Sequence, residues 1–66
     1  MSQTREYTVN GMTCHHCVLS VTEEVGAVAG VERVDVDLAS GRLVVLGEVD
    51  DAAVRAAVDE AGYEVA

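Results

Sequence analysis

Apolar and polar residues alternate in two stretches of the chain, residues 5–10 and residues 31–38. Strict alternation is typical of a strand with one buried face, so each stretch predicts such a strand. The side chains expected on the buried faces are Arg5, Tyr7, Val9, Val34, Val36 and Leu38. Residues 39–41 (Ala-Ser-Gly) predict a tight hairpin turn, because glycine readily adopts a positive φ angle. Residues 42–46 are almost continuously apolar and predict a strand that is buried more fully than its neighbours.

Between the first two strands, apolar residues recur at every third or fourth position. This spacing predicts an amphipathic helix from about His16 to Ala29. Its apolar stripe consists of Val18, Val21, Val25 and Val28. Thr13 is expected to cap the start of this helix, and Gly30 is expected to stop it. Gly26 lies inside the helix and is expected to cost about 1 kcal/mol relative to alanine.

A second helix is expected to begin at Asp50 or Asp51, either of which can cap it, and to end at Gly62. Its apolar stripe consists of Val54, Ala57, Val58 and Ala61. Residues 63–65 then form a short last strand. This order of elements predicts an α+β fold, the ferredoxin-like βαββαβ sandwich, with two helices on one face of a four-stranded antiparallel sheet. We expect one domain spanning residues 1–66.

The composition limits what the core can enclose. Half of the 66 residues are apolar, and these are almost entirely Val, Ala and Leu, with no Phe or Trp. A chain of this length buries only about 60% of the surface that its unfolded form exposes. We therefore expect a small aliphatic core without a deep catalytic cavity, and a functional site on a surface loop.

The formal net charge is −8, from twelve acidic residues against four arginines. This charge argues against a nucleic-acid partner, since phosphate neutralisation supplies most of the affinity there. It also disfavours anionic membrane surfaces. The apolar runs are far shorter than the ~20 residues of a membrane-spanning helix, and the first residues lack a signal peptide, so we expect a soluble cytoplasmic protein. The acidity fits a partner with a basic docking face, or serves only to keep the domain soluble.

Both cysteines lie in the run G-M-T-C-H-H-C at residues 11–17, between the first strand and the first helix. Thiolate sulfur is a soft ligand that suits Cu(I), and two ligands from one loop can bind it in near-linear geometry. A structural zinc site usually requires four ligands, which near-consecutive side chains cannot easily place around one ion. Cys17 is expected in the first helical turn, where free N–H groups and the helix dipole lower the pKa of a thiol. Cys14 is expected on the mobile loop before it.

The run at residues 11–17, the valine stripe that follows it and the Ala-Gly-Tyr at residues 61–63 together resemble the heavy-metal-associated (HMA) domain over essentially the whole chain. In particular, the chain is similar to small bacterial copper chaperones of the CopZ type. The resemblance implies a cytosolic copper(I) metallochaperone, not an enzyme, that binds Cu(I) through Cys14 and Cys17. It also implies copper transfer by thiolate exchange to the metal-binding domain of a copper-transporting P-type ATPase or to a copper-responsive regulator.

Five further residues are expected around the metal loop. Met12 is expected to plug the core beneath the loop, as in the family, rather than to bind metal through its thioether. Thr13 is the expected helix cap. His15 and His16 are either solvated or tune the basicity of the neighbouring thiolates. We favour the tuning role for His15. By the family resemblance Tyr63 flanks the site and shields copper, with an ordinary half-buried tyrosine as the alternative. Two adjacent histidines and the absence of lysine depart from the family pattern.

Three other interpretations stay open. A thiol–disulfide enzyme of the thioredoxin type is disfavoured, because the motif lacks the flanking Trp and the Gly-Pro spacer and the chain is too short. A metal-binding domain of a copper ATPase is the second, although Met1 and the stop at Ala66 favour a free-standing chain. A structural zinc module is the third. Two copies could also share copper through four thiolates, which predicts an apo monomer and a copper-bridged homodimer.

Overall fold

The computed structural model describes residues 3–66 and contains the predicted order of strands and helices. The elements are β1 (Thr4–Asn10), α1 (His15–Gly26), β2 (Val31–Asp37), β3 (Arg42–Gly47), α2 (Asp51–Glu60) and β4 (Glu64–Val65). Each bound lies within a few residues of its prediction. Among the described residues, neither helix is long and apolar enough to cross a membrane.

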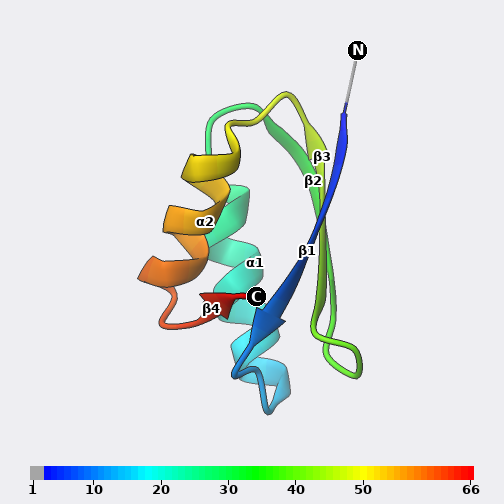
Figure 1. The fold of residues 1–66 in the computed structure, drawn as a ribbon, viewed down its shortest axis with the longest axis vertical. Helices are drawn as coiled ribbons and strands as arrows, with labels where there is room; N and C mark the ends of the chain where they lie inside the picture. Colours follow the sequence, from blue (N-terminus) through cyan, green and yellow to red (C-terminus); the bar gives the residue numbers. More distant parts are fainter. Residues whose placement is uncertain (1–2) are drawn as a thin grey trace.

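The four strands form one sheet in the order β2-β3-β1-β4, and every neighbouring pair is antiparallel. Both helices pack on the same face of this sheet, which confirms the ferredoxin-like sandwich (Figure 1). The central strand β1 pairs with β3 from Thr4 to Thr8. Its pairing with β4 covers only Val9 and Asn10, because β4 is two residues long. The remainder of that β1 edge therefore has no neighbouring strand among residues 3–66.

The core lies between the sheet and the helices and is aliphatic apart from one tyrosine. Its buried side chains are Tyr7, Val9, Val21, Val25, Leu43, Val45, Val49, Val54, Ala57 and Val58. Strand β3 supplies two fully buried side chains, which confirms that it is buried more fully than its neighbours. The predicted inward residues of β2, Val34 and Val36, are only half-buried, because β2 is an edge strand.

The limits of α1 differ from those predicted. Cys14, not Thr13, is the N-cap residue, and its side chain makes no capping hydrogen bond. Thr13 lies one residue too early for that role, so the prediction of a threonine cap was wrong. At the other end α1 stops at Gly26 instead of Ala29. The amides of Ala27 and Val28 donate to the carbonyls three residues earlier, those of Glu24 and Val25, and so tighten the last turn.

The ends of α2 are as predicted. The carboxylate of Asp50 accepts a hydrogen bond from the amide of Ala52, which makes Asp50 the N-cap. After α2 the chain reverses at Gly62, whose φ of 91° is readily accessible only to glycine. The amide of Tyr63 donates to the carbonyl of Val58, so this turn leads directly into β4.

The fully buried Leu43 is expected to be critical for stability. Leu43→Ala removes a side chain with 0% exposure and leaves a cavity, so we expect the free energy of unfolding to fall by about 3 kcal/mol. The matched control is Leu19→Ala, since Leu19 is 53% exposed; it should change stability by no more than about 0.5 kcal/mol. Urea unfolding of the reduced apo protein, followed by circular dichroism, measures both. Equal losses would contradict this core.

Candidate metal centre

The two cysteines lie at the junction between β1 and α1. This junction is at one end of the molecule (Figure 1). The chain leaves β1 through Gly11, which has a φ of 95°, and enters α1 after Cys14. The amide of Cys17 donates to the carbonyl of Cys14 over 3.1 Å, so Cys17 lies in the first helical turn as predicted. This single turn brings both side chains to the same side of the loop.

The sulfur atoms of the dithiol, Cys14 and Cys17, are 3.4 Å apart, and both cysteines are free. Cys14 is exposed, whereas Cys17 is half-buried. The pair is thus unequal: one sulfur is held in the first turn of a helix, and the other is open to solvent at the end of a loop.

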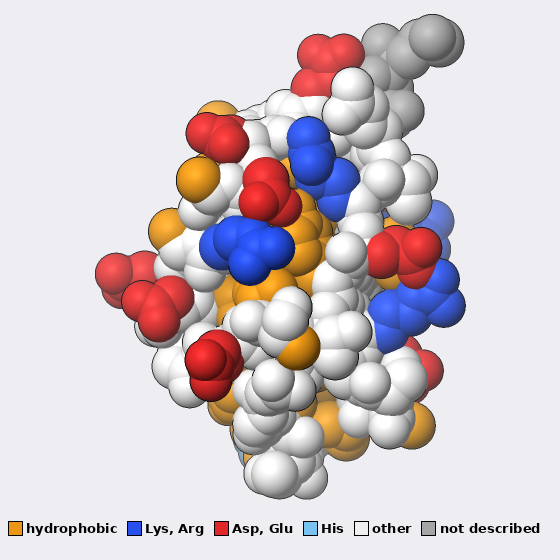
Figure 2. Space-filling model, in the orientation of Figure 1, with side chains coloured by type: hydrophobic (Ala, Val, Ile, Leu, Met, Phe, Trp, Pro, Cys, Tyr) orange, Lys and Arg blue, Asp and Glu red, His pale blue; other side chains and the backbone are white. Residues whose placement is uncertain are grey.

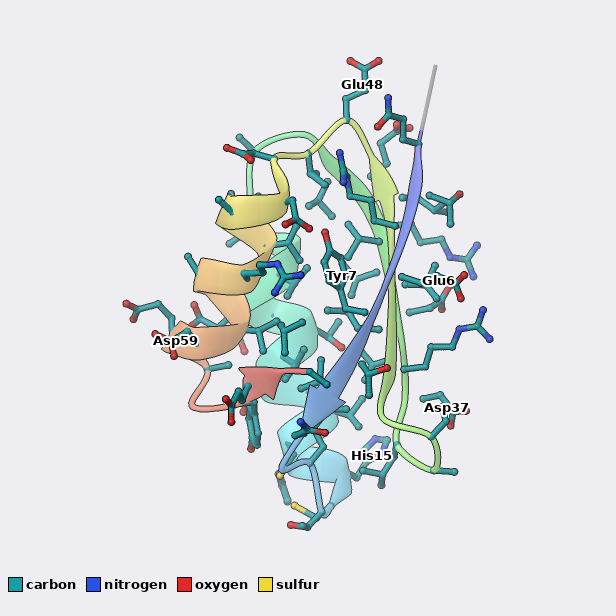
Figure 3. All side chains as sticks on the ribbon, in the orientation of Figure 1. Glu6, Tyr7, His15, Asp37, Glu48 and Asp59 are labelled. Carbon is teal, nitrogen blue, oxygen red and sulfur yellow. The ribbon has the colours of Figure 1, made fainter. Side chains whose placement is uncertain are left out.

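Among residues 3–66, no third His, Cys, Asp or Glu side chain joins the dithiol as a ligand. Within residues 3–66, no three His, Cys, Asp or Glu side chains come together in an arrangement that could bind a metal ion. His15 and His16 are both exposed at the start of α1, and the ring of His15 projects sideways from the helix (Figure 3). The donor set is therefore two thiols, which is incomplete for tetrahedral zinc.

The pKa of Cys17 is lowered from 9.0 to about 6. The largest influence is a hydrogen bond from the hydroxyl of Tyr63, followed by the backbone amide of Thr13 and then the thiol and amide of Cys14. Partial burial opposes these effects, but it is the weakest influence. Cys17 is therefore largely a thiolate at neutral pH, the form that binds metal. The sequence predicted the lowered pKa from the helix start but did not identify Tyr63 as its main cause.

Tyr63 reaches the dithiol because β4 pairs with the end of β1. Asn10 pairs with Glu64, and this places the turn after α2 beside the metal loop. A Cβ atom on Gly11 would lie 3.4 Å from Cδ1 of Tyr63, so the ring packs directly against the loop. The same hydrogen bond to Cys17 raises the pKa of Tyr63, because the neutral hydroxyl is its donor.

The other two predicted loop residues lie on opposite sides of the backbone. Met12 is half-buried and packs against the core cluster, where a flexible thioether side chain fills space. Thr13 is exposed and affects the site through its backbone amide. The structure thus brings Tyr63 and the backbone of Thr13 to the dithiol and places Met12 beneath it. The roles predicted for Met12, His15, His16 and Tyr63 in metal binding stay predictions.

A ferredoxin-like sandwich with an exposed cysteine pair between its first strand and first helix defines a class of small domains that bind soft metal ions. Residues 6–64 match the heavy-metal-associated domain, and the chain belongs to this family.

Individual relatives agree with this assignment. The chain is 40% identical over 65 residues to the copper chaperone CopZ of Enterococcus hirae, an alignment that covers 91% of each chain. It is 41% identical over 63 residues to copper-transporting ATPase 1 of Rhizobium meliloti, covering 92% of this chain and 8% of the ATPase. Among solved structures, a CopZ metallochaperone superposes with a TM-score of 0.93 at 28% identity, covering 97% of this chain and 100% of the other.

The Tyr63 hydroxyl is expected to control the acidity of Cys17. Tyr63→Phe removes the largest stabilising hydrogen bond to the thiolate, so the pKa of Cys17 should rise from about 6 by about one unit. Alkylation rates measured against pH, with the modified cysteine identified by mass spectrometry, give this value. Tyr7→Phe is the matched control, because the hydroxyl of Tyr7 bonds to Asp51 instead.

The same measurement tests the histidine hypothesis. If His15 tunes the site, His15→Ala shifts the pKa of Cys17; an unchanged value in that variant would end the hypothesis. An unchanged pKa in Tyr63→Phe would contradict the role assigned to the tyrosine.

Proposed function

We propose that this protein is a copper(I) chaperone that binds one Cu(I) between Cys14 and Cys17 and passes it to a partner protein. The observation that carries the proposal is the dithiol itself: two sulfurs 3.4 Å apart, one of them exposed, with no third ligand among residues 3–66. Binding and release of a metal ion, rather than catalysis, is the chemistry that such a surface site supports.

The geometry favours a two-coordinate ion. Metal–thiolate bonds are about 2.3 Å long, so a linear arrangement requires sulfurs about 4.6 Å apart. The separation of 3.4 Å must therefore open by about 1.2 Å. Cys14 is free to make this movement, since it is exposed and its side chain forms no capping bond. Cu(I) is soft and accepts two thiolates, whereas zinc would lack two ligands here.

Transfer proceeds by ligand exchange without a change of oxidation state. A thiolate of the partner forms a bond to copper, which gives a three-coordinate intermediate. The bond to exposed Cys14 then breaks, and a second partner thiolate displaces Cys17; each released sulfur can take up a proton. The unequal exposure of the two cysteines gives the exchange an order, because the accessible sulfur is displaced first.

The partner that we propose is the cytosolic metal-binding domain of a copper-transporting P-type ATPase, or a copper-responsive regulator, with the protein itself in the cytoplasm. The 41% identity to a segment of a copper-transporting ATPase supports this, because two similar metal-binding segments can exchange copper with little difference in affinity. The same match makes a second candidate reasonable, that the chain acts as a metal-binding domain of such an ATPase. Both candidates use the same dithiol.

Copper(I) binding is expected to depend on both cysteines. Anaerobic titration of the reduced protein against a competing chelator should give one tightly bound Cu(I) per chain. Replacing both residues, Cys14→Ser with Cys17→Ser, should abolish competition with the chelator, because a hydroxyl is a poor ligand for a soft ion. Met12→Leu is the control, since it conserves packing volume and should change the affinity by less than about threefold.

Two results would overturn the proposal: a wild-type protein that does not bind Cu(I), or a doubly substituted protein that binds it as well as the wild type does. A loss of affinity in Met12→Leu comparable to that of the cysteine variants would show that the thioether is a ligand.

Copper is also expected to drive self-association. Two exposed dithiols can share copper through four thiolates, so we expect monomers of the apo protein and concentration-dependent dimers of the loaded protein. Sedimentation velocity at several copper loadings measures this. The doubly substituted protein serves as the control and should stay monomeric, while a wild-type monomer at every loading would contradict the prediction.

A further inference from the structure

The end of the molecule that carries the dithiol is free of acidic and basic side chains. It consists of residues 10–22, 38–41 and 61–63, which together form the neutral end, and none of them is Asp, Glu, Lys or Arg. All twelve acidic residues and all four arginines lie elsewhere, in a chain of which 24% is charged. The lower end of the face in Figure 2 accordingly shows no acidic or basic side chain.

The three segments of the neutral end are far apart in the sequence but meet around the dithiol. The amide of Val9 donates to the carbonyl of Gly41 over 2.7 Å, which holds the hairpin turn beside the end of β1. Tyr63 reaches Cys17 from the turn after α2. Leu19, in the first half of α1, is 53% exposed and is the large apolar side chain that residues 3–66 leave most open to solvent. The fold therefore assembles one uncharged surface from three separate segments.

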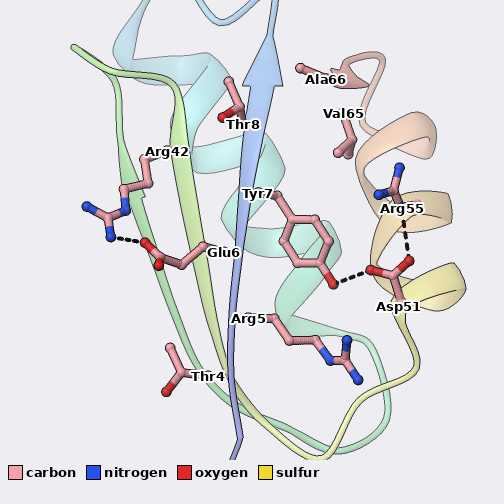
Figure 4. Close-up of a pocket in the computed structure, with 10 residues that line it drawn as sticks. All are labelled: Thr4, Arg5, Glu6, Tyr7, Thr8, Arg42, Asp51, Arg55, Val65 and Ala66. Atoms are coloured by element: carbon pink, nitrogen blue, oxygen red, sulfur yellow. Dashed lines mark hydrogen bonds and ion pairs between the residues drawn. The ribbon is translucent and has the colours of Figure 1, made fainter.

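All four arginines act on carboxylates of the chain itself. These interactions are the pairs Arg42–Glu6, Arg55–Asp51 and Arg33–Asp35, and the action of the Arg5 charge on Asp51. Figure 4 shows the first two pairs as dashed lines. The remaining charge of the chain is acidic, −8 in total, and at the border of the neutral end Asp59 and Glu64 line a hollow beside Tyr63. The dithiol thus has an uncharged surround and an acidic rim.

A partner that takes copper directly from the dithiol must cover the neutral end. This step rests on the proposed function, in which copper passes from sulfur to sulfur. A transient protein contact buries up to about 600 Å² on each partner, the area of a disc of about 14 Å radius. The extents of the molecule are 33 × 20 × 19 Å, and the dithiol lies at one end of the long axis (Figure 1). A disc centred on the dithiol therefore covers that whole end.

We propose that the neutral end is the contact surface for the copper acceptor, and that this acceptor presents an uncharged surface around its own thiols. Charged residues are depleted at the centre of protein interfaces, and the neutral end has this composition. A basic surface centred on the acceptor's thiols would lose hydration from its cations without gaining a carboxylate in exchange. The acidic rim, with Asp59 and Glu64, affects the rate of encounter, while apolar contact and shape hold the complex.

Copper exchange between two copies of the protein tests the proposal, because a second copy presents the same uncharged end and serves as the acceptor. Isotope-labelled apo protein is mixed with unlabelled Cu(I)-loaded protein without oxygen. NMR exchange spectroscopy at several protein concentrations then gives the second-order rate constant for exchange. The same substitution is made at two exposed alanines, Ala39 in the neutral end and Ala56 on α2. Both variants have the same net charge, so the long-range repulsion between copies is equal.

A charge of either sign in the neutral end should slow the exchange. We expect Ala39→Glu to exchange copper about tenfold more slowly than Ala56→Glu, and Ala39→Lys about tenfold more slowly than Ala56→Lys. Leu19→Lys should also exchange more slowly than Ala56→Lys, which makes the result independent of the hairpin turn. Chelator competition should give each variant the wild-type affinity for Cu(I), because none of these side chains is a ligand.

The outcomes separate this inference from the proposed function. Equal rates for the substitutions of Ala39 and Ala56 would overturn the inference, and so would faster exchange by Ala39→Lys than by Ala56→Lys. In either case the protein still binds copper, so the proposed function stands. A wild-type protein that does not compete with the chelator for Cu(I) would overturn the proposed function, and this inference with it.

Discussion

The short pairing between β4 and the end of β1 is the constraint on which the rest of the molecule depends. It joins only Val9 and Asn10 to Val65 and Glu64, yet it brings the turn after α2 beside the loop before α1. Tyr63 lies in that turn, and its hydroxyl is the main cause of the lowered pKa of Cys17. On its other edge β1 pairs with β3 from Thr4 to Thr8. One short contact between strands thus places Tyr63 where it acts on the dithiol.

The core and the dithiol use different residues. The buried side chains come from the sheet and from the inner faces of the helices, and neither cysteine is among them. Met12 connects the two regions, since it packs on the core directly before the metal loop. The free energy of folding is therefore supplied by aliphatic packing, while the loop keeps an exposed sulfur that can move. A chaperone requires this separation. If metal binding also stabilised the fold, release of the ion would lower the stability of the protein.

Most of the fold follows from local patterns in the sequence. Alternation predicted β1 and β2, a continuous apolar run predicted β3, and the spacing of Val and Ala predicted the helices. The position of the two cysteines predicted where the candidate site lies. These patterns did not predict features that depend on the geometry of a single turn or on contacts between residues far apart in the sequence. Thr13 has the right chemistry for a cap but stands one residue before the position that helix geometry selects. The hydrogen bond from Tyr63 to Cys17 spans most of the chain, and no local pattern contains it.

The placement of the two aromatic rings has a practical consequence. The chain has two tyrosines and no tryptophan. Tyr7 is buried and donates to the carboxylate of Asp51, whereas Tyr63 stands next to Cys17. The near-ultraviolet spectrum of the unlabelled protein therefore arises from two rings, one of which lies beside the ligand sulfur. Tyr63 can therefore serve as an intrinsic spectroscopic probe of metal binding and release at the dithiol.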